Sequence, residues 1–337
     1  MSVAVQFYVA TLLVYVGVDT MLAWGFNLQY GLGGTLNLAF VVFEAVGGYT
    51  VAVLTLGPSS GNGGFESYIV GLSLPFPIPV LIAALCGAAS SALVGFVVLK
   101  RLRSDYLALA LLVMAVIATQ VVVGAQGLFN GQEGLYLVPQ PLMSRLGLSS
   151  VGYQWAYVGW TAIVTLAVYL VVRRLKVSPF GRALRAARDH EDAAQALGRN
   201  VFRMRLTAFV LGGAIAATAG AVLVEYISAW SPGSWLYTEG IVVMACVVVG
   251  GTGNNLGAML GALLIPVTFS EITRLIPTGT LGSLIEPIQE MVIGLLILTV
   301  LWVRPQGLVP ERRRRFPPRV EANRGDATEG VPLRGGA

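Results

Sequence analysis

The apolar residues of this chain are grouped in blocks of about twenty, and short polar or glycine-rich stretches separate the blocks. A helix that crosses the hydrocarbon core of a bilayer needs about twenty apolar residues, because it rises about 1.5 Å per residue. The blocks therefore predict membrane-spanning helices over residues 5–24, 35–56, 78–99, 106–124, 153–172, 206–224 and 287–303.

One further apolar stretch, residues 240–270, is interrupted by the run GGTGNN at residues 250–255. Each half is too short for a comfortable span, so this stretch predicts a helical hairpin or two broken helices that meet at glycines. Together the blocks predict an all-α fold, a polytopic transmembrane helical bundle of about nine spans (roughly eight to ten) with broken helices. This transmembrane domain covers residues 1–304.

The distribution of basic residues predicts how the bundle is oriented across the membrane. They gather around Lys100, in a long loop over residues 173–205, and around Arg304 and the following run of arginines. Nine crossings place these three regions on one side of the membrane, while acidic or nearly neutral segments around residues 66, 133–145, 225–239 and 271–274 fall on the other. Because Lys and Arg stay preferentially in the cytoplasm, we expect an outside N-terminus and a cytoplasmic C-terminus.

Residues 305–337 form a basic stretch that is rich in Arg, Pro and Gly and poor in large apolar side chains. Such a segment buries too little surface to fold by itself, so we expect a disordered cytoplasmic tail. Its arginines are expected to lie near anionic lipid headgroups.

Composition agrees with lipid as the main solvent, because 55% of the 337 residues are apolar and only 12% are charged. The net charge of +5 does not indicate nucleic acid as a partner, since the basic residues lie at the ends of apolar blocks without interleaved aromatic residues. The only cysteines, Cys86 and Cys246, lie inside apolar blocks, which predicts buried thiols and neither a disulfide framework nor a metal site.

The sequence offers no catalytic centre. Its two lysines, Lys100 and Lys176, do not follow the glycines of a phosphate-binding loop, so any ATP hydrolysis must come from another polypeptide. No βαβ unit surrounds the glycines after Val249, and the single histidine, His190, cannot build a triad or a His-rich metal site. We therefore expect neither a cofactor nor an enzyme in this chain; a membrane-embedded enzyme would need clustered carboxylates, metal ligands or an activated nucleophile.

The long basic loop contains the run SPFGRALRAARDHEDAAQALGRNV, which starts at Ser178 with a helix N-terminal signal and predicts a short amphipathic helix that ends at Gly198. Its apolar face would comprise Leu184, Ala187, Ala194 and Leu197, and its polar face Arg182, Arg185, Arg188 and Asp189. A cytoplasmic partner or the membrane surface would cover such a helix.

This loop resembles the coupling loop of ABC importer permeases, whose pattern is Glu-Ala-Ala, three residues, then Gly. Asp192, Ala193, Ala194 and Gly198 fit the pattern, with Asp in place of Glu. The preceding SPFGRALRA is similar to permeases for branched-chain amino acids, as are KRLRSDYLALA after Leu99, NGQEGL from Asn130 and VGGTGNNLGAMLGA after Val248. The second span resembles that family at residues 48–52, although its usual Ser-Leu-Gly-His-Ala is replaced by residues 35–39.

The resemblance covers residues 10–310 in order and is to the membrane permease subunits of branched-chain amino acid ABC importers. It implies a bacterial inner-membrane protein that works with a sister permease or a second copy of itself, two ABC ATPase subunits that carry ATP and magnesium, and a periplasmic or lipid-anchored binding protein. By the same resemblance, ATPase coupling would involve Gly181, Arg182, Asp192, Ala193, Ala194 and Gly198.

A translocation pathway is expected at the subunit interface or between broken helices, because free backbone groups are tolerated in lipid only where protein or water satisfies them. The candidates are Asn37, Glu44, Gly47, Gly48, Tyr49, Gly250, Gly251 and Gly253. Glu44 lies inside a span, where a carboxylate is costly, so it is either functional or a hydrogen-bonded structural residue. Asp19 near the end of the first span is interpreted as structural.

Such a pathway would suit a zwitterion with an apolar side chain, and the resemblance favours a branched-chain amino acid. Urea or a short amide would satisfy the same physical constraints. An ATP-independent secondary transporter or channel is the alternative class, and it would not need the coupling loop.

Overall fold

The computed structural model describes residues 2–58, 66–102, 104–141, 143, 147–268, 285–304 and 306–311. The expectation for the tail beyond residue 311, and the neutral segment around residues 271–274, lie outside the described residues. The helices are α1 Val3–Asn27, η1 Leu28–Leu32, α2 Phe40–Thr55, α3 Ile78–Arg101, α4 Ser104–Gly124, α5 Gln126–Phe129, α7 Ser150–Val177, α8 Pro179–Asp189, α9 Glu191–Ala196, α10 Val201–Ile227, η3 Pro232–Trp235, α11 Tyr237–Gly250, α12 Asn255–Ala262, η4 Leu263–Thr268 and α14 Ile285–Val303. Two short strands, β1 Leu135–Tyr136 and β2 Ala229–Trp230, pair antiparallel.

Six helical segments among the described residues are long and apolar enough to cross a membrane: Val3–Leu32, Ile78–Arg101, Tyr106–Gly124, Ser150–Val177, Val201–Ile227 and Pro232–Gly250. Three shorter apolar helices accompany them, Phe40–Thr55, Asn255–Pro266 and Met291–Val303. These segments correspond to the blocks predicted from the sequence, and the polytopic helical membrane bundle is confirmed.

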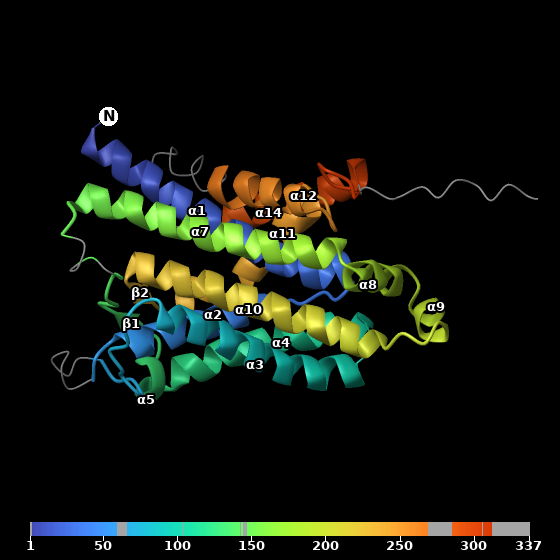
Figure 1. Cartoon of the computed structure of the whole chain (residues 1–337), viewed down its shortest axis with the longest axis horizontal. Coiled ribbons are helices and arrows are strands. Elements are labelled where there is room, and N and C mark those ends of the chain that lie inside the picture. Colours follow the sequence, from blue (N-terminus) through green and yellow to red (C-terminus); the bar gives the residue numbers. More distant parts are fainter. Residues whose placement is uncertain are drawn as a thin grey trace, which may run out of the picture.

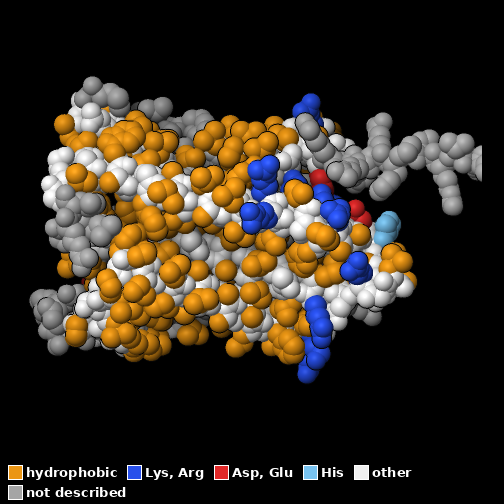
Figure 2. Space-filling view, in the orientation of Figure 1, with side chains coloured by type: hydrophobic (Ala, Val, Ile, Leu, Met, Phe, Trp, Pro, Cys, Tyr) orange, Lys and Arg blue, Asp and Glu red, His pale blue; other side chains and the backbone are white. Residues whose placement is uncertain are grey.

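The long helices run side by side along the longest axis of the molecule (Figure 1). Helices α8 and α9 project at one end, and the N-terminus lies at the opposite end together with α5, β1 and β2 (Figure 1). The end with α8 and α9 is called the coupling end, after the coupling loop that the sequence leads us to expect there, and the other is called the opposite end. Figure 2 shows the visible Lys and Arg side chains at the coupling end, while hydrophobic side chains cover most of the rest of that face. The described parts of the basic regions that the sequence places on one side of the membrane therefore lie at one end of the bundle.

Helix α10 holds the bundle together because α2 and α3 pack closely against it. A Cβ atom at Gly47 of α2 would overlap the backbone carbonyl of Ala217, and a Cβ atom at Gly87 of α3 would overlap the Ala217 side chain. A Cβ atom at Gly213 of α10 would in turn overlap Ser91 of α3. Small residues let helix backbones approach one another in lipid, where packing replaces the hydrophobic driving force.

The second span starts later than predicted, at Phe40 rather than at residue 35, because residues 33–39 are not helical. Helix α1 passes into the π-helical turn η1, and Gly34 then takes a left-handed conformation with a φ of 69°. Side-chain hydrogen bonds of Asn37 and Gln29 stabilise the irregular segment in place of helical ones. The apolar character of residues 35–39 concealed this break.

The stretch predicted as a hairpin or broken helices is a hairpin of α11 and α12. Its turn comprises residues 251–254, and α12 continues into the π-helical η4. The two arms touch through glycines, since Cβ atoms at Gly250 and Gly261 would overlap the backbones of Gly257 and Cys246 respectively.

Candidate functional site

Helix α8 begins where the sequence predicts, directly after Ser178. The Ser178 hydroxyl accepts a hydrogen bond from the Gly181 backbone N–H at 3.2 Å, and Pro179 occupies the first turn. Gly181, Leu184 and Ala187 are buried against the bundle. A Cβ atom at Gly181 would overlap the carbonyl oxygen of Leu175, so α8 folds back closely on the end of α7.

The sequence predicts one coupling helix that continues to Gly198, but the structure contains two shorter helices instead. The helical run breaks at His190, which has an extended backbone, and a second helix, α9, starts at Glu191. Glu191 and Asp192 in the first turn of α9 stabilise this new N-terminus, because carboxylates interact favourably with the helix dipole there.

The break changes which side chains are buried. Ala187, Ala194 and Val201 form a small buried cluster, but Leu197 lies beyond the end of α9 and is 82% exposed. The prediction that Leu197 belongs to the apolar face was therefore wrong, because helical periodicity stops at Ala196. Gly198 follows with a φ of 75°, and its N–H donates to the Gln195 carbonyl at 2.8 Å. This left-handed residue closes α9.

The six residues named for ATPase coupling divide into two groups. Gly181 and Ala194 are buried and seat the two helices on the bundle. Arg182, Asp192, Ala193 and Gly198 are exposed at the projecting end. Arg182 lies in the first turn of α8, and the other three lie with Leu197 on α9 and the turn after it, so both helices carry accessible residues.

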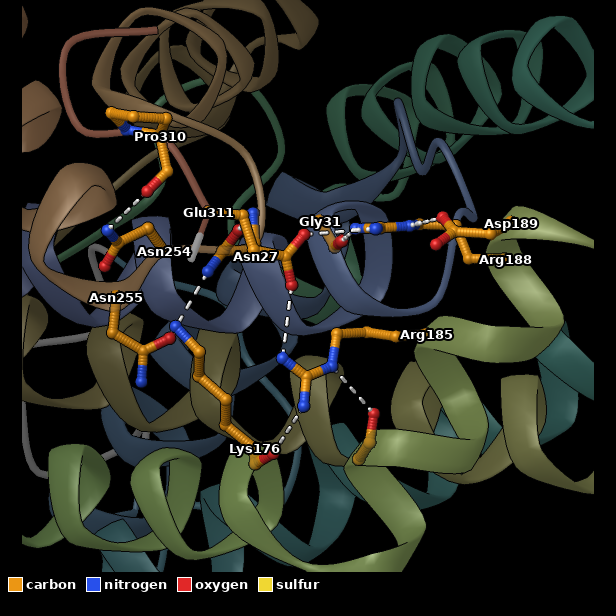
Figure 3. A network of polar contacts seen from close by, with 12 residues as sticks. Asn27, Gly31, Lys176, Arg185, Arg188, Asp189, Asn254, Asn255, Pro310 and Glu311 are labelled. Carbon is orange, nitrogen blue, oxygen red and sulfur yellow. Dashed lines mark hydrogen bonds and ion pairs between the residues drawn. The ribbon is translucent and has the colours of Figure 1, made fainter. Parts of the chain in front are cut away.

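The prediction that Arg185 and Arg188 point away from the protein was also wrong. Both guanidinium groups reach the carboxylate of Glu311, at 3.2 Å for Arg185 and 3.1 Å for Arg188 (Figure 3). Partial burial lowers the pKa of Arg188, but the neighbouring carboxylates of Asp189 and Glu311 more than offset this effect, and the net pKa is raised. Sequence reasoning missed Glu311, although a single carboxylate directly before the run Arg312–Arg315 was a usable signal.

Asn37, a pathway candidate, is fully buried in the irregular segment between η1 and α2. Its side-chain N–H donates to the Gln29 side-chain oxygen at 2.9 Å, and its oxygen accepts from the Ala39 backbone N–H at 3.1 Å. Gln29 donates in turn to the carbonyl of Phe209 in α10 at 2.8 Å. The buried side chains of Asn37 and Gln29 are thus hydrogen-bonded within the chain and connect the irregular segment to α10.

The candidates on α2 face α10 and the opposite end. Glu44 is 4% exposed, and its backbone lies against Gly220, as Gly47 lies against Ala217. Gly48 contacts the indole of Trp230. Tyr49 packs on Phe129 with ring centroids 4.5 Å apart and, edge-on, on Trp230 and Trp235.

Gly250, Gly251 and Gly253 lie elsewhere, at the turn of the α11–α12 hairpin at the coupling end. A Cβ atom at Gly251 would overlap the Val309 carbonyl, and one at Gly253 would come within 2.7 Å of the Glu311 carboxylate. The structure therefore separates the candidates on α2 from those of the hairpin. The hairpin turn lies beside the end of α1, where a Cβ atom at Gly31 would lie 2.5 Å from the Gly253 nitrogen.

Cys246 is buried and Cys86 is partly buried, and both are free thiols. Within the described residues, no group of three or more His, Cys, Asp or Glu side chains is arranged to hold a metal ion.

Comparison with known proteins agrees with this architecture. Residues 8–301 match the family model described as branched-chain amino acid transport system / permease component. The high-affinity branched-chain amino acid transport system permease protein LivM of Escherichia coli (strain K12) is 30% identical over 91% of this chain and 71% of its own length. The protein of the same name in Salmonella typhimurium is 31% identical over 87% of this chain and 68% of its own length. A probable branched-chain amino acid transport permease protein LivM of Methanocaldococcus jannaschii is 29% identical over 85% of this chain and 83% of its own length.

No solved structure matches the chain. The family model spans the helices that carry both groups of candidate residues, from α1 to α14. The chain therefore belongs to the family of permease components of branched-chain amino acid transport systems.

Proposed function

We propose that this chain is the membrane-spanning permease subunit of an ATP-driven importer for branched-chain amino acids. It pairs with a sister permease or a second copy of itself, and two separate ATPase subunits bind ATP and magnesium. A binding protein on the opposite side delivers the substrate. The observation that carries this proposal is the accessible surface of α8 and α9, which projects from the basic end of the bundle and is seated by buried Gly181, Leu184 and Ala194.

This surface has the properties that energy coupling requires. Helix α8 is capped at its start and packed along one side, so it moves as a rigid body when a partner displaces it. Arg182 of α8, Asp192 of α9 and the unusually exposed Leu197 after α9 are accessible to a partner. An apolar side chain surrounded by charged ones is the composition of a protein contact with a polar rim.

The proposed substrate follows from the charges inside the bundle. Among the described residues, the last turns of α3 and α7 carry Lys100, Arg101, Arg174 and Lys176, so these cations lie at the ends of spans. In the described parts of the spans, the buried charged side chains are the carboxylates of Glu44 and Glu225. This arrangement disfavours an anionic solute and suits a neutral or zwitterionic one. Branched-chain amino acids are the members of that class that the printed names of the relatives indicate.

The substrate is tested by competition in vesicles that contain the permease pair, its ATPases and its binding protein. We expect labelled leucine to enter the vesicles, and unlabelled isoleucine or valine to suppress the signal. Urea and short amides should leave the signal unchanged at equal concentration. Suppression by urea, with no effect of isoleucine, would assign the importer to the other solute class.

We further propose that the coupling end faces the cytoplasm and the N-terminus faces outward. Ala193 and Gln132 are exposed at the two ends of the bundle, so each position accepts a reporter cysteine. In a background in which Cys86 and Cys246 are replaced by Ala, Ala193→Cys should react with an impermeant maleimide only after the cytoplasmic side is opened. Gln132→Cys should react in intact cells. Labelling of both positions from one side would reject this orientation.

A further inference from the structure

Residues 306–311, called the C-terminal strap here, follow α14 and run along the turn of the α11–α12 hairpin. The backbone N–H groups of Leu308 and Val309 donate to the carbonyls of Val249 and Gly250, at 2.8 and 3.0 Å. The Asn254 side chain donates to the Val309 and Pro310 carbonyls at 3.4 and 3.3 Å (Figure 3). These bonds fix the strap to the hairpin and place Glu311 beside α8.

Glu311 uses each carboxylate oxygen for a different arginine of α8. Oε1 pairs with Arg185 and Oε2 with Arg188, which lie one turn apart on the same face of the helix. The side chains of Glu311, Arg185 and Arg188 are 15%, 25% and 20% exposed, so water screens these ion pairs less than it would on an open surface. A single carboxylate thereby holds two positions of the coupling helix.

The same arginines continue the contact into the bundle. Arg188 also donates to the carbonyl of Gly31, at the end of α1 and η1, and Arg185 donates to the carbonyls of Lys176 and Gly181 at 3.3 Å (Figure 3). A Cβ atom at Gly34 would lie 2.8 Å from Cγ of Arg188, so α8 sits directly on the irregular segment that leads to α2.

The hairpin turn is fixed to the same end of α1. The Gly253 N–H donates to the Asn27 side-chain oxygen at 2.8 Å, and Asn27 donates to the Asn255 side chain at 3.4 Å. The Trp24 indole donates to the Asn255 carbonyl at 2.8 Å. Glu311 therefore lies where α8, the end of α1 and the hairpin turn meet.

We propose that Glu311 is a positioning residue for energy coupling, and that its pairs with Arg185 and Arg188 carry a displacement of α8 through the strap to the α11–α12 hairpin, whose turn is fixed to the end of α1. This inference rests on the proposed function. The chain itself connects α8 only to α7 and, through α9, to α10. Arg188 itself adds a lateral connection to η1 and the segment after it. Glu311 adds a second connection, from α8 through the strap to the hairpin turn. Interrupted helices of this kind absorb the changes in backbone angle that a rocking bundle requires.

The test compares two rates in the same vesicles, leucine uptake and ATP hydrolysis, with the full complex of permeases, ATPases and binding protein. Glu311→Gln keeps the shape of the side chain and removes its charge. We expect ATP hydrolysis to persist and the leucine transported per ATP hydrolysed to fall roughly fivefold, because the variant weakens two partly buried charge-assisted contacts. Glu311→Asp, which restores the charge on a shorter side chain, should recover part of the ratio.

The matched control is Glu66→Gln, the same substitution at the opposite end, where Glu66 accepts a hydrogen bond from the Tyr136 N–H at 3.1 Å. An amide oxygen still accepts this bond, although more weakly than a carboxylate, and Glu66 lies at the other end of the bundle from α8, so the ratio should not change. A ratio in Glu311→Gln equal to that of the wild type, or a parallel loss of both rates, would show that the ion pairs only stabilise the strap.

If Glu311→Gln does not assemble, Arg185→Gln is judged by the same ratio, because it removes one pair and leaves Arg188 bound to Glu311. An unchanged ratio there overturns the proposal. Leucine uptake by the wild-type complex without ATP would reject the proposed function itself, and the two failures are thus distinguishable.

Discussion

Replacing Gly198 with Val is expected to abolish transport while the helical bundle still inserts into the membrane. Gly198 closes α9 with a φ of 75°, and no heavy atom lies within 4 Å of the position that a Cβ atom would occupy. The cost is therefore conformational rather than steric. A β-branched residue in the left-handed region costs at least about 1–2 kcal/mol, and the chain would relieve this strain by moving the turn that presents Leu197 and Asp192.

Gly198→Asn is the matched variant, because Asn tolerates the left-handed conformation far better than Val does. We expect Asn to retain most of the uptake and Val to lose it, with equal amounts of both permeases in the membrane. Co-purification of the ATPases should fall only in the Val variant. Normal uptake by Gly198→Val would mean that α8 and α9 lie passively at the membrane surface and do not couple ATP hydrolysis to transport.

Gly47→Ala is expected to destabilise the bundle, although it adds only one methyl group. The new Cβ atom would overlap the backbone carbonyl of Ala217, and neither the α2 nor the α10 backbone can move aside as a flexible side chain would. Overpacking of this kind typically costs about 1–3 kcal/mol. The unfolding temperature of the purified protein in detergent should fall, together with the yield of folded protein.

Gly159→Ala in α7 provides the control, since no heavy atom lies within 4 Å of its Cβ position. Alanine is the better helix former, so this variant should be neutral or more stable by up to about 1 kcal/mol. If Gly47→Ala kept its full stability but lost uptake, Gly47 would line the pathway rather than pack α2 against α10.

The parts of the fold that the sequence predicted well depend on local patterns. Blocks of about twenty apolar residues are long enough to identify spans without knowledge of their neighbours. The hairpin turn follows from the glycines after Val249, and the start of α8 follows from Ser178 and Pro179. Each of these features is specified within a few residues.

The parts that the sequence did not predict depend on contacts between distant residues. The sequence pattern predicts that Arg185 and Arg188 lie on a solvent-exposed helix face, because their partner, Glu311, lies more than a hundred residues further along the chain. The irregular segment before Phe40 contains apolar residues that resemble a continuing span, and the hydrogen bond from Gln29 to the Phe209 carbonyl fixes it to α10. Local hydropathy contains no information about either contact.

The most direct measurement of the central claim is leucine uptake with and without ATP inside the vesicles that contain the full complex. The account predicts uptake against a gradient when ATP and magnesium are enclosed, and none when ATP is omitted or when the ATPase subunits are inactivated by substitution of their phosphate-binding lysine. Accumulation of leucine without ATP, or by the permease alone, would contradict the account and identify the chain as an ATP-independent transporter or channel.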